Sequence, residues 1–291
     1  CCCSGLVMCP TTNWSRGRSS NDARRIHKGV VHPYGEPAIT LRMSLGFPRN
    51  PRYGIARVLS KRGVCSRTQA AEWVRAGRVS VGGRVVRDPE SPTALDRDDI
   101  AIDGHPVAAA SPVRLMLNKP RGLVTTISDE HGRDTVYRCF EGASLLGAPL
   151  PWIAPVGRLD KASEGLLLFT NDPQWASRIT DPETGPRKTY RVQIDRIPEA
   201  DLLSALCDGV DDAGERLTAV SANLLSAGEK NAWVEIVLDE GRNRQIRRLL
   251  AAFDIDVLRL VRVAIGGLPL GDLAKGQWRT LDAEDLRRIG I

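Results

Sequence analysis

The chain has 291 residues, of which 42% are hydrophobic, so it carries enough apolar material for one large or two ordinary packed domains. Its formal net charge of +6 favours a polyanionic partner. No run approaches the roughly 20 apolar residues that a membrane-spanning helix needs, because Arg259 and Arg262 interrupt the densest stretch. The seven cysteines and four histidines lack the spacing of a disulfide framework or a zinc site. These features predict a globular protein that binds no metal and does not span a membrane. We expect it to be a cytoplasmic monomer.

The first 50 residues mix Ser, Arg, Gly, Pro and Cys without helical or strand periodicity. We therefore expect residues 1–50 to form a disordered extension. Its first ten residues also lack the basic-then-apolar order of a secretory signal. Met43 stands just ahead of the first periodic segment, which makes it a candidate for the biological start.

Residues 51–105 have the pattern of a small domain that begins with two helices. An apolar stripe from Ile55 to Leu59 lies on one helical face, and Gly63 is positioned to end that helix. Ser66, with Gln69 three residues later, is the signature of a capping box and predicts a second helix.

A hairpin and a third strand are expected to follow these helices. The segments 79–81 and 84–86 alternate Val with polar residues around Gly82-Gly83, a two-residue turn that requires positive φ. Ile100 and Ile102 predict the third strand, and Asp103-Gly104 is another turn signal.

A second, larger domain is predicted for residues 113–291, after a linker at 106–112 that is rich in Ala and Pro. Its apolar runs with strand character lie at 113–118, 166–170, 190–194, 233–238 and 257–265, and a helix is expected from about 243 to 253. Because these strands do not alternate regularly with long helices, we expect an α+β fold with a mixed, mostly antiparallel sheet.

Positive charge is concentrated in the small domain, where the segment 52–87 holds nine Lys or Arg against the single acid Glu72. Any one of these side chains alone would be an ordinary solvated residue, but the excess favours phosphate binding without base reading. The candidate RNA-binding residues are Arg57, Lys61, Arg62, Arg67, Arg75 and Arg78.

Asp160 lies in the most informative string of the chain, GRLDKASEGLLLFTND at 157–172, which leads from a loop into a nearly all-apolar strand. A lone loop aspartate is ordinarily a turn or cap residue, so the residue type by itself indicates little. Three further strings follow the same chain order. They are NKPRG at 118–122, KTY at 188–190 and GRNRQIRR at 241–248.

These four strings resemble the motifs of the RsuA-type family of bacterial rRNA pseudouridine synthases. The strings RVLSKRGVCSR at 57–67 and AGRVSVGG at 76–83 resemble the S4-like RNA-binding domain that precedes the catalytic domain in that family. Together the similarities extend over nearly all of residues 53–281. They imply an isomerase that converts uridine to pseudouridine in ribosomal RNA.

The resemblance also implies the roles of individual residues. Asp160 matches the catalytic aspartate and Arg158 the adjacent arginine that fills the space left by the flipped base. Tyr190 matches the tyrosine that stacks on the target base, although a strand tyrosine can equally be a packing residue. Arg247 matches the arginine that pairs with the aspartate, whereas Arg244 and Arg248 are expected to face solvent.

The same resemblance implies that no cofactor is needed, because the isomerisation uses neither a redox equivalent nor a phosphate donor. The late motif looks more like that of the enzymes acting on the large subunit. We therefore expect 23S rRNA, free or in a pre-ribosomal particle, with 16S rRNA as the alternative.

Two other functions compete with this interpretation. One is a non-catalytic S4-like protein that clamps ribosomal RNA, although binding alone would not require Asp160, Tyr190 and Arg247 together. The other is a glycosidase or nucleosidase that uses Asp160 and Glu164 as paired carboxylates. Glu164 is more simply explained as a residue that supports the loop.

Overall fold

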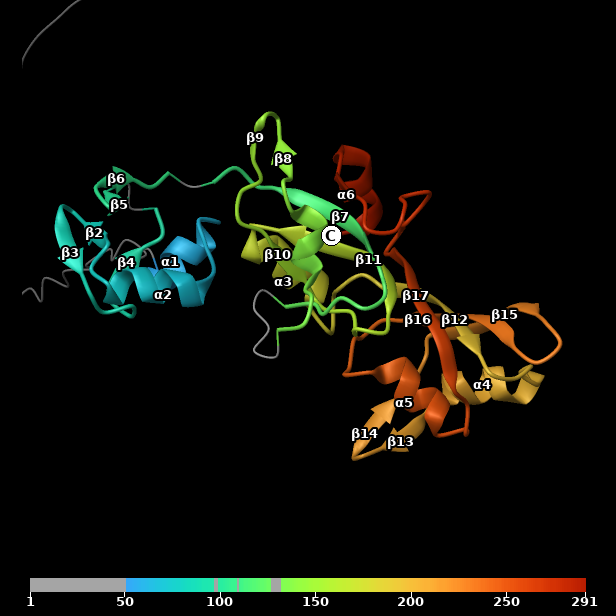
Figure 1. The fold of residues 1–291 in the computed structure, drawn as a ribbon. Helices are drawn as coiled ribbons and strands as arrows, with labels where there is room; N and C mark the ends of the chain where they lie inside the picture. The colour runs from blue at the N-terminus through green and yellow to red at the C-terminus, as the bar shows by residue number, and fades with distance from the viewer. Residues whose placement is uncertain (1–50, 97–98, 109, 127–131) are drawn as a thin grey trace, which may run out of the picture. The chain divides into compact units, whose positions relative to one another are not determined.

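The computed structural model describes residues 51–96, 99–108, 110–126 and 132–291 (Figure 1). The predicted disordered extension and the candidate start at Met43 lie outside these residues. In the described part of the chain, no helix is long and apolar enough to cross a membrane. The elements form one group with its own core between residues 52 and 107, and a larger group after residue 113.

The first group contains two helices and six short strands. Strand β1 pairs with β4, and a four-stranded antiparallel sheet has the order β3-β2-β5-β6. The elements are β1 (Arg52–Gly54), α1 (Ile55–Lys61), α2 (Arg67–Arg75), β2 (Val79–Val81), β3 (Arg84–Val86), β4 (Pro92–Ala94), β5 (Ile100–Ile102) and β6 (His105–Pro106).

The local signals of this segment are confirmed. The Ser66 hydroxyl accepts a hydrogen bond from the backbone N–H of Gln69 at 3.1 Å and so caps α2. Gly82 and Gly83 have φ of 60° and 73°, which the two-residue turn between β2 and β3 requires. The apolar faces of the two helices and of β2 and β5 are buried together in one cluster.

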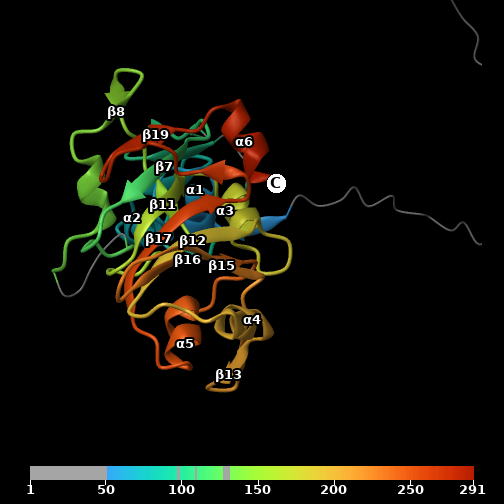
Figure 2. The same ribbon diagram turned by 90° about the vertical axis from the view of Figure 1, so that its right-hand side faces the viewer.

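The second group is built on a nine-stranded mixed sheet, whose main path has the order β15-β16-β12-β17-β11-β7-β19. Figure 2 shows these strands in that order, from β19 to β15. On the main path the strands are β7 (Arg114–Lys119), β11 (Glu164–Thr170), β12 (Lys188–Ile194), β15 (Ser221–Ala227), β16 (Ala232–Leu238), β17 (Val257–Ile265) and β19 (Trp278–Thr280). All its pairings are antiparallel except β11 with β17. The predicted α+β fold with a mostly antiparallel sheet is confirmed.

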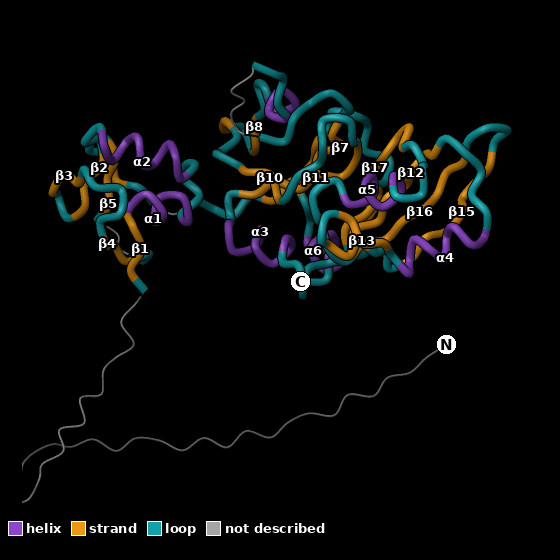
Figure 3. The backbone as a smooth tube through the Cα atoms, turned by 90° about the horizontal axis from the view of Figure 1, so that it is seen from below, coloured by secondary structure: helices purple, strands orange, loops and turns teal. Residues whose placement is uncertain are grey.

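Helices pack on both faces of this sheet, and the sheet lies between two hydrophobic cores. Figure 3 shows the helices in purple and the strands of the sheet in orange. Helices α4 (Ala200–Asp208) and α5 (Gln245–Ala251) cover one core, which also contains the 3-10 helix η1 (Val136–Phe140). Helices α3 (Pro173–Thr180) and α6 (Ala283–Ile289) cover the other. The remaining short strands are β8 (Ser144–Leu145), β9 (Ala148–Pro149), β10 (Ala154–Val156), β13 (Val210–Asp212), β14 (Glu215–Leu217) and β18 (Leu268–Pro269).

Strand β11 is buried on both faces, which explains its almost uninterrupted apolar sequence. Leu167 and Phe169 belong to the first core, whereas Leu166 and Leu168 belong to the second. A strand that is covered on both sides has no solvent-facing positions, so the usual alternation of apolar and polar residues is absent.

The parallel contact between β11 and β17 spans only two residue pairs, Glu164 with Val261 and Gly165 with Arg262. A Cβ at Gly165 would lie 2.2 Å from the carbonyl oxygen of Arg262, and Gly165 has φ +102°. This position therefore requires glycine. Beyond it the two strands separate, and the loop that carries Asp160 lies immediately before β11.

Candidate active site

A cleft of about 620 Å³ lies beside the place where strands β11 and β17 part, and Asp160 lines it. Side chains from β12, β17, α3 and the loop before α5 line the cleft together with residues 156–160. The walls combine apolar residues such as Leu238, Leu260 and Ile265 with several arginines. Such a mixture of apolar walls and a few charged groups is typical of a pocket that binds and transforms a ligand.

Buried donors fix the backbone of the Asp160 loop. Lys119, fully buried at the end of β7, donates from Nζ to the carbonyls of Asp160 at 3.2 Å, Ser163 at 2.9 Å and Pro120 at 3.1 Å. The Thr125 hydroxyl donates to the carbonyl of Leu159 at 2.7 Å. The backbone of the Asp160 loop is therefore positioned by Lys119 of strand β7.

Lys119 was not among the residues singled out from the sequence. Burial lowers its pKa to about 8, against the opposing effect of Asp160, Cys139 and Glu164, which favour the charged form. The available signal was a lysine inside a strand whose other positions are mostly apolar. Such a lysine needs buried acceptors, which here are carbonyls of the loop.

The ion pair at Asp160 differs from the expectation. Arg244 Nη1 lies 3.6 Å from Asp160 Oδ2, whereas Arg247 Nη1 donates to the carbonyl of Val257 at 3.2 Å. The expected pairing of Arg247 with the aspartate is therefore not found, and Arg244 takes that place. The reason is that Arg244 is not part of α5, which begins at Gln245, but is a left-handed residue with φ 51° ahead of it.

Arg247 nevertheless remains beside the carboxylate. Burial and the nearby Arg244 lower its pKa, whereas the charge of Asp160 raises it. Its Nε is buried and has no hydrogen-bond partner among the described residues. Arg247 therefore has one donor without an acceptor among the described residues.

Arg248 also differs from the expectation of a solvent-facing side chain. Its Nε donates to Asp212 at 2.5 Å and its Nη1 to Glu215 at 2.6 Å, which ties α5 to the hairpin of β13 and β14. These two carboxylates raise the pKa of Arg248. Arg248 is thus a structural residue of the segment that carries Arg244 and Arg247.

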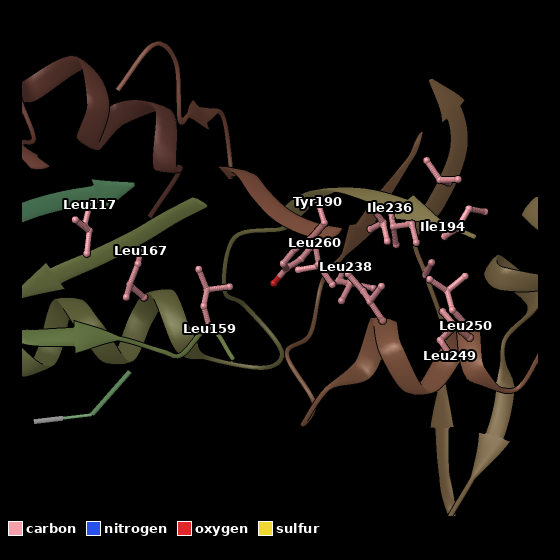
Figure 4. Packing of buried hydrophobic residues seen from close by; sticks show 14 of the residues in the cluster. Leu117, Leu159, Leu167, Tyr190, Ile194, Ile236, Leu238, Leu249, Leu250 and Leu260 are labelled. Atoms are coloured by element: carbon pink, nitrogen blue, oxygen red, sulfur yellow. The ribbon is translucent and has the colours of Figure 1, made fainter. Parts of the chain in front are cut away.

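Tyr190 is 9% exposed on β12 and lines the cleft. Figure 4 shows its ring beside Leu260 and Leu238, so packing and cleft formation coincide at this residue. Arg158 also lines the cleft and is exposed, two residues before Asp160. The structure therefore brings Asp160, Arg158, Tyr190 and Arg247 into one cleft, as the sequence predicts.

Glu164 does not line this cleft. It is 3% exposed and accepts from Arg259 Nε at 2.9 Å, while Lys275 Nζ lies 2.6 Å away. Burial raises the pKa of Glu164, but the hydrogen bonds from these two cations outweigh that effect and lower it. A carboxylate held in this way cannot act as the partner acid of Asp160, which removes the support for a paired-carboxylate glycosidase.

Five of the six candidate RNA-binding residues are exposed or half-buried in the first group. Arg57 and Lys61 lie over the ring of Tyr53, and Arg78 forms an ion pair with Asp103. Arg67 and Arg75 are exposed on α2.

Arg62 is the exception, because it is 8% exposed and donates to the carbonyls of Leu95 and Val107. Its guanidinium connects the helices to two later segments of the chain. The expected role of Arg62 as an RNA contact is therefore replaced by a structural role. In the described part of the chain, no three His, Cys, Asp or Glu residues are grouped as a metal site would need.

Comparison with known proteins agrees with this architecture. Residues 114–252 match the RNA pseudouridylate synthase family, and residues 54–92 match the S4 domain. A Bacillus subtilis (strain 168) protein named ribosomal large subunit pseudouridine synthase B is 32% identical over 237 residues, covering 81% of this chain and 94% of that protein. A Xanthomonas campestris protein named ribosomal large subunit pseudouridine synthase E is 40% identical over 188 residues, covering 60% of this chain and 97% of that protein.

A solved structure described as a crystal structure of pseudouridylate synthase has a TM-score of 0.56 and 27% identity, over 81% of this chain and 99% of that chain. The fold and cleft are thus those of an RNA-modifying isomerase with an S4 domain ahead of it. The chain belongs to the RNA pseudouridine synthase family. The resemblance to RsuA-type enzymes is confirmed by these matches.

Proposed function

We propose that the protein isomerises one uridine of 23S rRNA to pseudouridine, with Asp160 as the catalytic residue. The observation that carries the proposal is the Asp160 carboxylate, which lies on a cleft between apolar walls with Arg244 and Arg247 beside it. The names of the Bacillus and Xanthomonas relatives support the large subunit as the source of the substrate. We further propose that the enzyme works in the cytoplasm as a monomer, on free rRNA or on a pre-ribosomal particle.

The reaction breaks the bond between ribose carbon 1 and uracil nitrogen 1, and it forms a bond between the same ribose carbon and uracil carbon 5. The proton on carbon 5 leaves to solvent and nitrogen 1 takes up a proton, so no second substrate is consumed. One ionised carboxylate suffices as the nucleophile or as the base. The apolar cleft walls hold the detached uracil while it turns.

The target uridine must leave its stack before it can reach the cleft, at a cost of a few kcal/mol that RNA contacts recover. We propose that the exposed Arg158 occupies the vacated position and that the ring of Tyr190 stacks on the flipped base. Arg247 would then use its free Nε to hold Asp160 or the base in position.

We also propose a division of labour along the chain, with residues 51–105 as the RNA-binding domain, 106–112 as a linker and 113–291 as the catalytic domain. Arg57, Lys61, Arg67, Arg75 and Arg78 would hold phosphates without reading bases. Replacing the exposed Arg57, Arg67 and Arg75 together by Gln should weaken RNA binding and make its salt dependence shallower, because each neutralised phosphate contact contributes to the slope.

Mapping pseudouridines in rRNA from cells with and without the gene tests the proposal. We expect one position in 23S rRNA to remain uridine in the deletion strain and to be restored by the wild-type gene. Loss of a position in 16S rRNA instead would transfer the substrate to the small subunit. Identical maps in the two strains would favour a protein that binds rRNA without modifying it.

A further inference from the structure

A second group of positive side chains lies on the cleft apart from the residues assigned above. Lys188 and Tyr190 are two residues apart on β12, so their side chains share one face of the sheet. Arg262 on β17 is the direct cross-strand partner of Tyr190 and therefore also lies on that face. Lys188, Tyr190 and Arg262 all line the cleft.

The sheet is irregular at this point. The register between β12 and β17 shifts between Thr189 and Tyr190, so that β17 contributes one extra residue. The bulge allows Arg262 and Ile265 to line the same cleft although they are three residues apart. Bulges of this kind commonly redirect side chains near active sites.

The guanidinium of Arg262 uses only part of its hydrogen-bonding capacity within the described residues. It is 5% exposed, and its Nε donates at 2.7 Å to the carbonyl of Leu166, where β11 separates from β17. Its Nη2 is buried and has no hydrogen-bond partner among the described residues. A buried guanidinium donor without an acceptor costs free energy, and a bound ligand could supply the missing acceptor.

Lys188 likewise lacks a strong partner. Within the described residues, its Nζ donates only to the backbone carbonyl of Asp239, at 3.4 Å. Burial lowers the pKa of Lys188, and the neighbouring Arg262 lowers it further, against the weaker opposing effect of Asp239. Two cations that destabilise each other favour the binding of an anion between them.

The acids of the cleft are engaged elsewhere. Asp160 pairs with Arg244, and Glu240 accepts from Arg242 and Gln245. Asp181 accepts from the backbone N–H groups of residues 183 and 184. None of these contacts neutralises Lys188 or Arg262.

We infer that Lys188 and Arg262 form a phosphate-binding subsite, which holds one phosphodiester of the substrate RNA next to the nucleotide whose base stacks on Tyr190. The inference rests on the proposed function, since the phosphate belongs to the RNA that the enzyme modifies. An arginine presents a planar fork to phosphate oxygens, and a lysine adds a compact charge. Anchoring a phosphate beside the flipped nucleotide holds the RNA on the cleft without touching Asp160 or its loop.

The test compares Lys188→Gln with Arg191→Gln, which removes the same charge from the same strand. Arg191 is exposed and lies on the opposite face of β12, between Tyr190 and Val192. The RNA is a 23S rRNA fragment that the wild-type protein modifies, as measured by tritium release from carbon-5-labelled uridine. If the wild-type protein modifies no 23S fragment, the proposed function itself is wrong. That outcome differs from a failure of the subsite alone.

Lys188→Gln should weaken RNA binding about tenfold and reduce the slope of log affinity against log salt by about 0.7, as expected for one lost phosphate contact on single-stranded RNA. KM should rise as the affinity falls, while kcat stays within about twofold of the wild-type value because Asp160 and its loop are untouched. Arg191→Gln should leave affinity, slope and KM unchanged. Equal losses in the two variants would overturn the subsite.

Phosphate ethylation of the RNA, at one position per molecule, then locates the contact. Ethylation of a linkage beside the target uridine should interfere with binding of the wild-type protein and of Arg191→Gln, but no longer with binding of Lys188→Gln. Arg262→Gln keeps a donor for the Leu166 carbonyl. If this variant folds, ethylation of the same linkage should no longer interfere with its binding of RNA. Unchanged interference in Lys188→Gln would contradict the inference, whether or not Arg262→Gln folds.

Discussion

Two segments meet at the cleft, and they are held in opposite ways. The Asp160 loop is anchored through its backbone, because Lys119 and Thr125 donate to its carbonyls from within the protein. The segment ahead of α5 is anchored through side chains, and it extends Arg244 towards the carboxylate from a left-handed residue. The backbone that carries the carboxylate is therefore held by buried donors, whereas Arg244 and Arg247 approach the carboxylate only through their long side chains.

Removing Lys119 should have the largest effect. Lys119→Met leaves three loop carbonyls without their buried donor, so we expect the free energy of unfolding to fall by about 4 kcal/mol and turnover by more than 100-fold. Chemical denaturation and tritium release measure the two effects. Lys161→Met, an exposed change in the same loop, is the control and should be nearly neutral.

The same variant gives a pH test. The pKa of Lys119 is lowered to about 8, so the unfolded chain binds more protons than the folded chain between that pH and the ordinary lysine value. The stability of the wild-type protein relative to Lys119→Met should therefore rise by roughly 3 kcal/mol as the pH increases from about 8 to about 10.5. A pH-independent difference would show that the ammonium is not desolvated in the folded protein.

The close contact between β11 and β17 gives the next largest effect. Gly165→Ala would place a Cβ 2.2 Å from the carbonyl oxygen of Arg262, so it should destabilise the protein by about 3 kcal/mol. Gly122→Ala is a matched control, because Gly122 has φ +100° against +102° but no atom within 4 Å of the added Cβ. Thermal or chemical unfolding measures the stability of both variants. Equal losses of stability would mean that the backbone conformation, and not the close approach of β17, requires glycine at position 165.

The side-chain contacts near Asp160 are tested by replacing Arg247 and Arg244. We expect Arg247→Ala to lower kcat about 100-fold, because its half-buried guanidinium has a free donor for the bound state. Arg244→Ala removes an exposed ion pair and should cost about tenfold or less, mainly in KM. Single-turnover and steady-state kinetics separate these effects, and the reverse order would make Arg244 the functional partner of Asp160.

Arg248 should give the smallest effect. Arg248→Gln loosens the tie between α5 and the β13–β14 hairpin, so the melting temperature should fall by about 3 °C while kcat stays within about twofold. A large loss of activity with an unchanged melting temperature would instead assign Arg248 to the RNA.

The sequence predicted the elements that have strong local signals. The strand at 257–265 and the cap at Ser66 agree with the structure, because apolar periodicity and a side-chain oxygen ahead of a helix act over a few residues. Helix α4 and strand β15 were not predicted. Much of β15 is exposed at an edge of the sheet, so its sequence carries little burial pattern.

The errors in the predicted site came from a helix boundary and from contacts between residues that are distant in sequence. The expected helix at 243–253 treated Arg244 as helical, but α5 begins at Gln245, and the left-handed residue ahead of it changes which arginine reaches Asp160. Arg62 was read as a surface cation, although its acceptors lie 33 and 45 residues later. Local patterns do not encode such contacts, whereas the convergence of Asp160, Arg158, Tyr190 and Arg247 on one cleft was implied by the motifs.

Tritium release from 23S rRNA that carries carbon-5-labelled uridine, measured with Asp160→Asn and with Asp181→Asn, tests the central claim most directly. Both residues line the cleft, but the carboxylate of Asp181 accepts hydrogen bonds from the backbone N–H groups of residues 183 and 184 and from the side chain of Thr184, a role that an amide oxygen can keep. Asp160→Asn should bind RNA normally and release no tritium above background, while Asp181→Asn should release it at a rate close to that of the wild-type protein. Tritium release by Asp160→Asn at the wild-type rate would contradict the assignment of this carboxylate as the catalytic group.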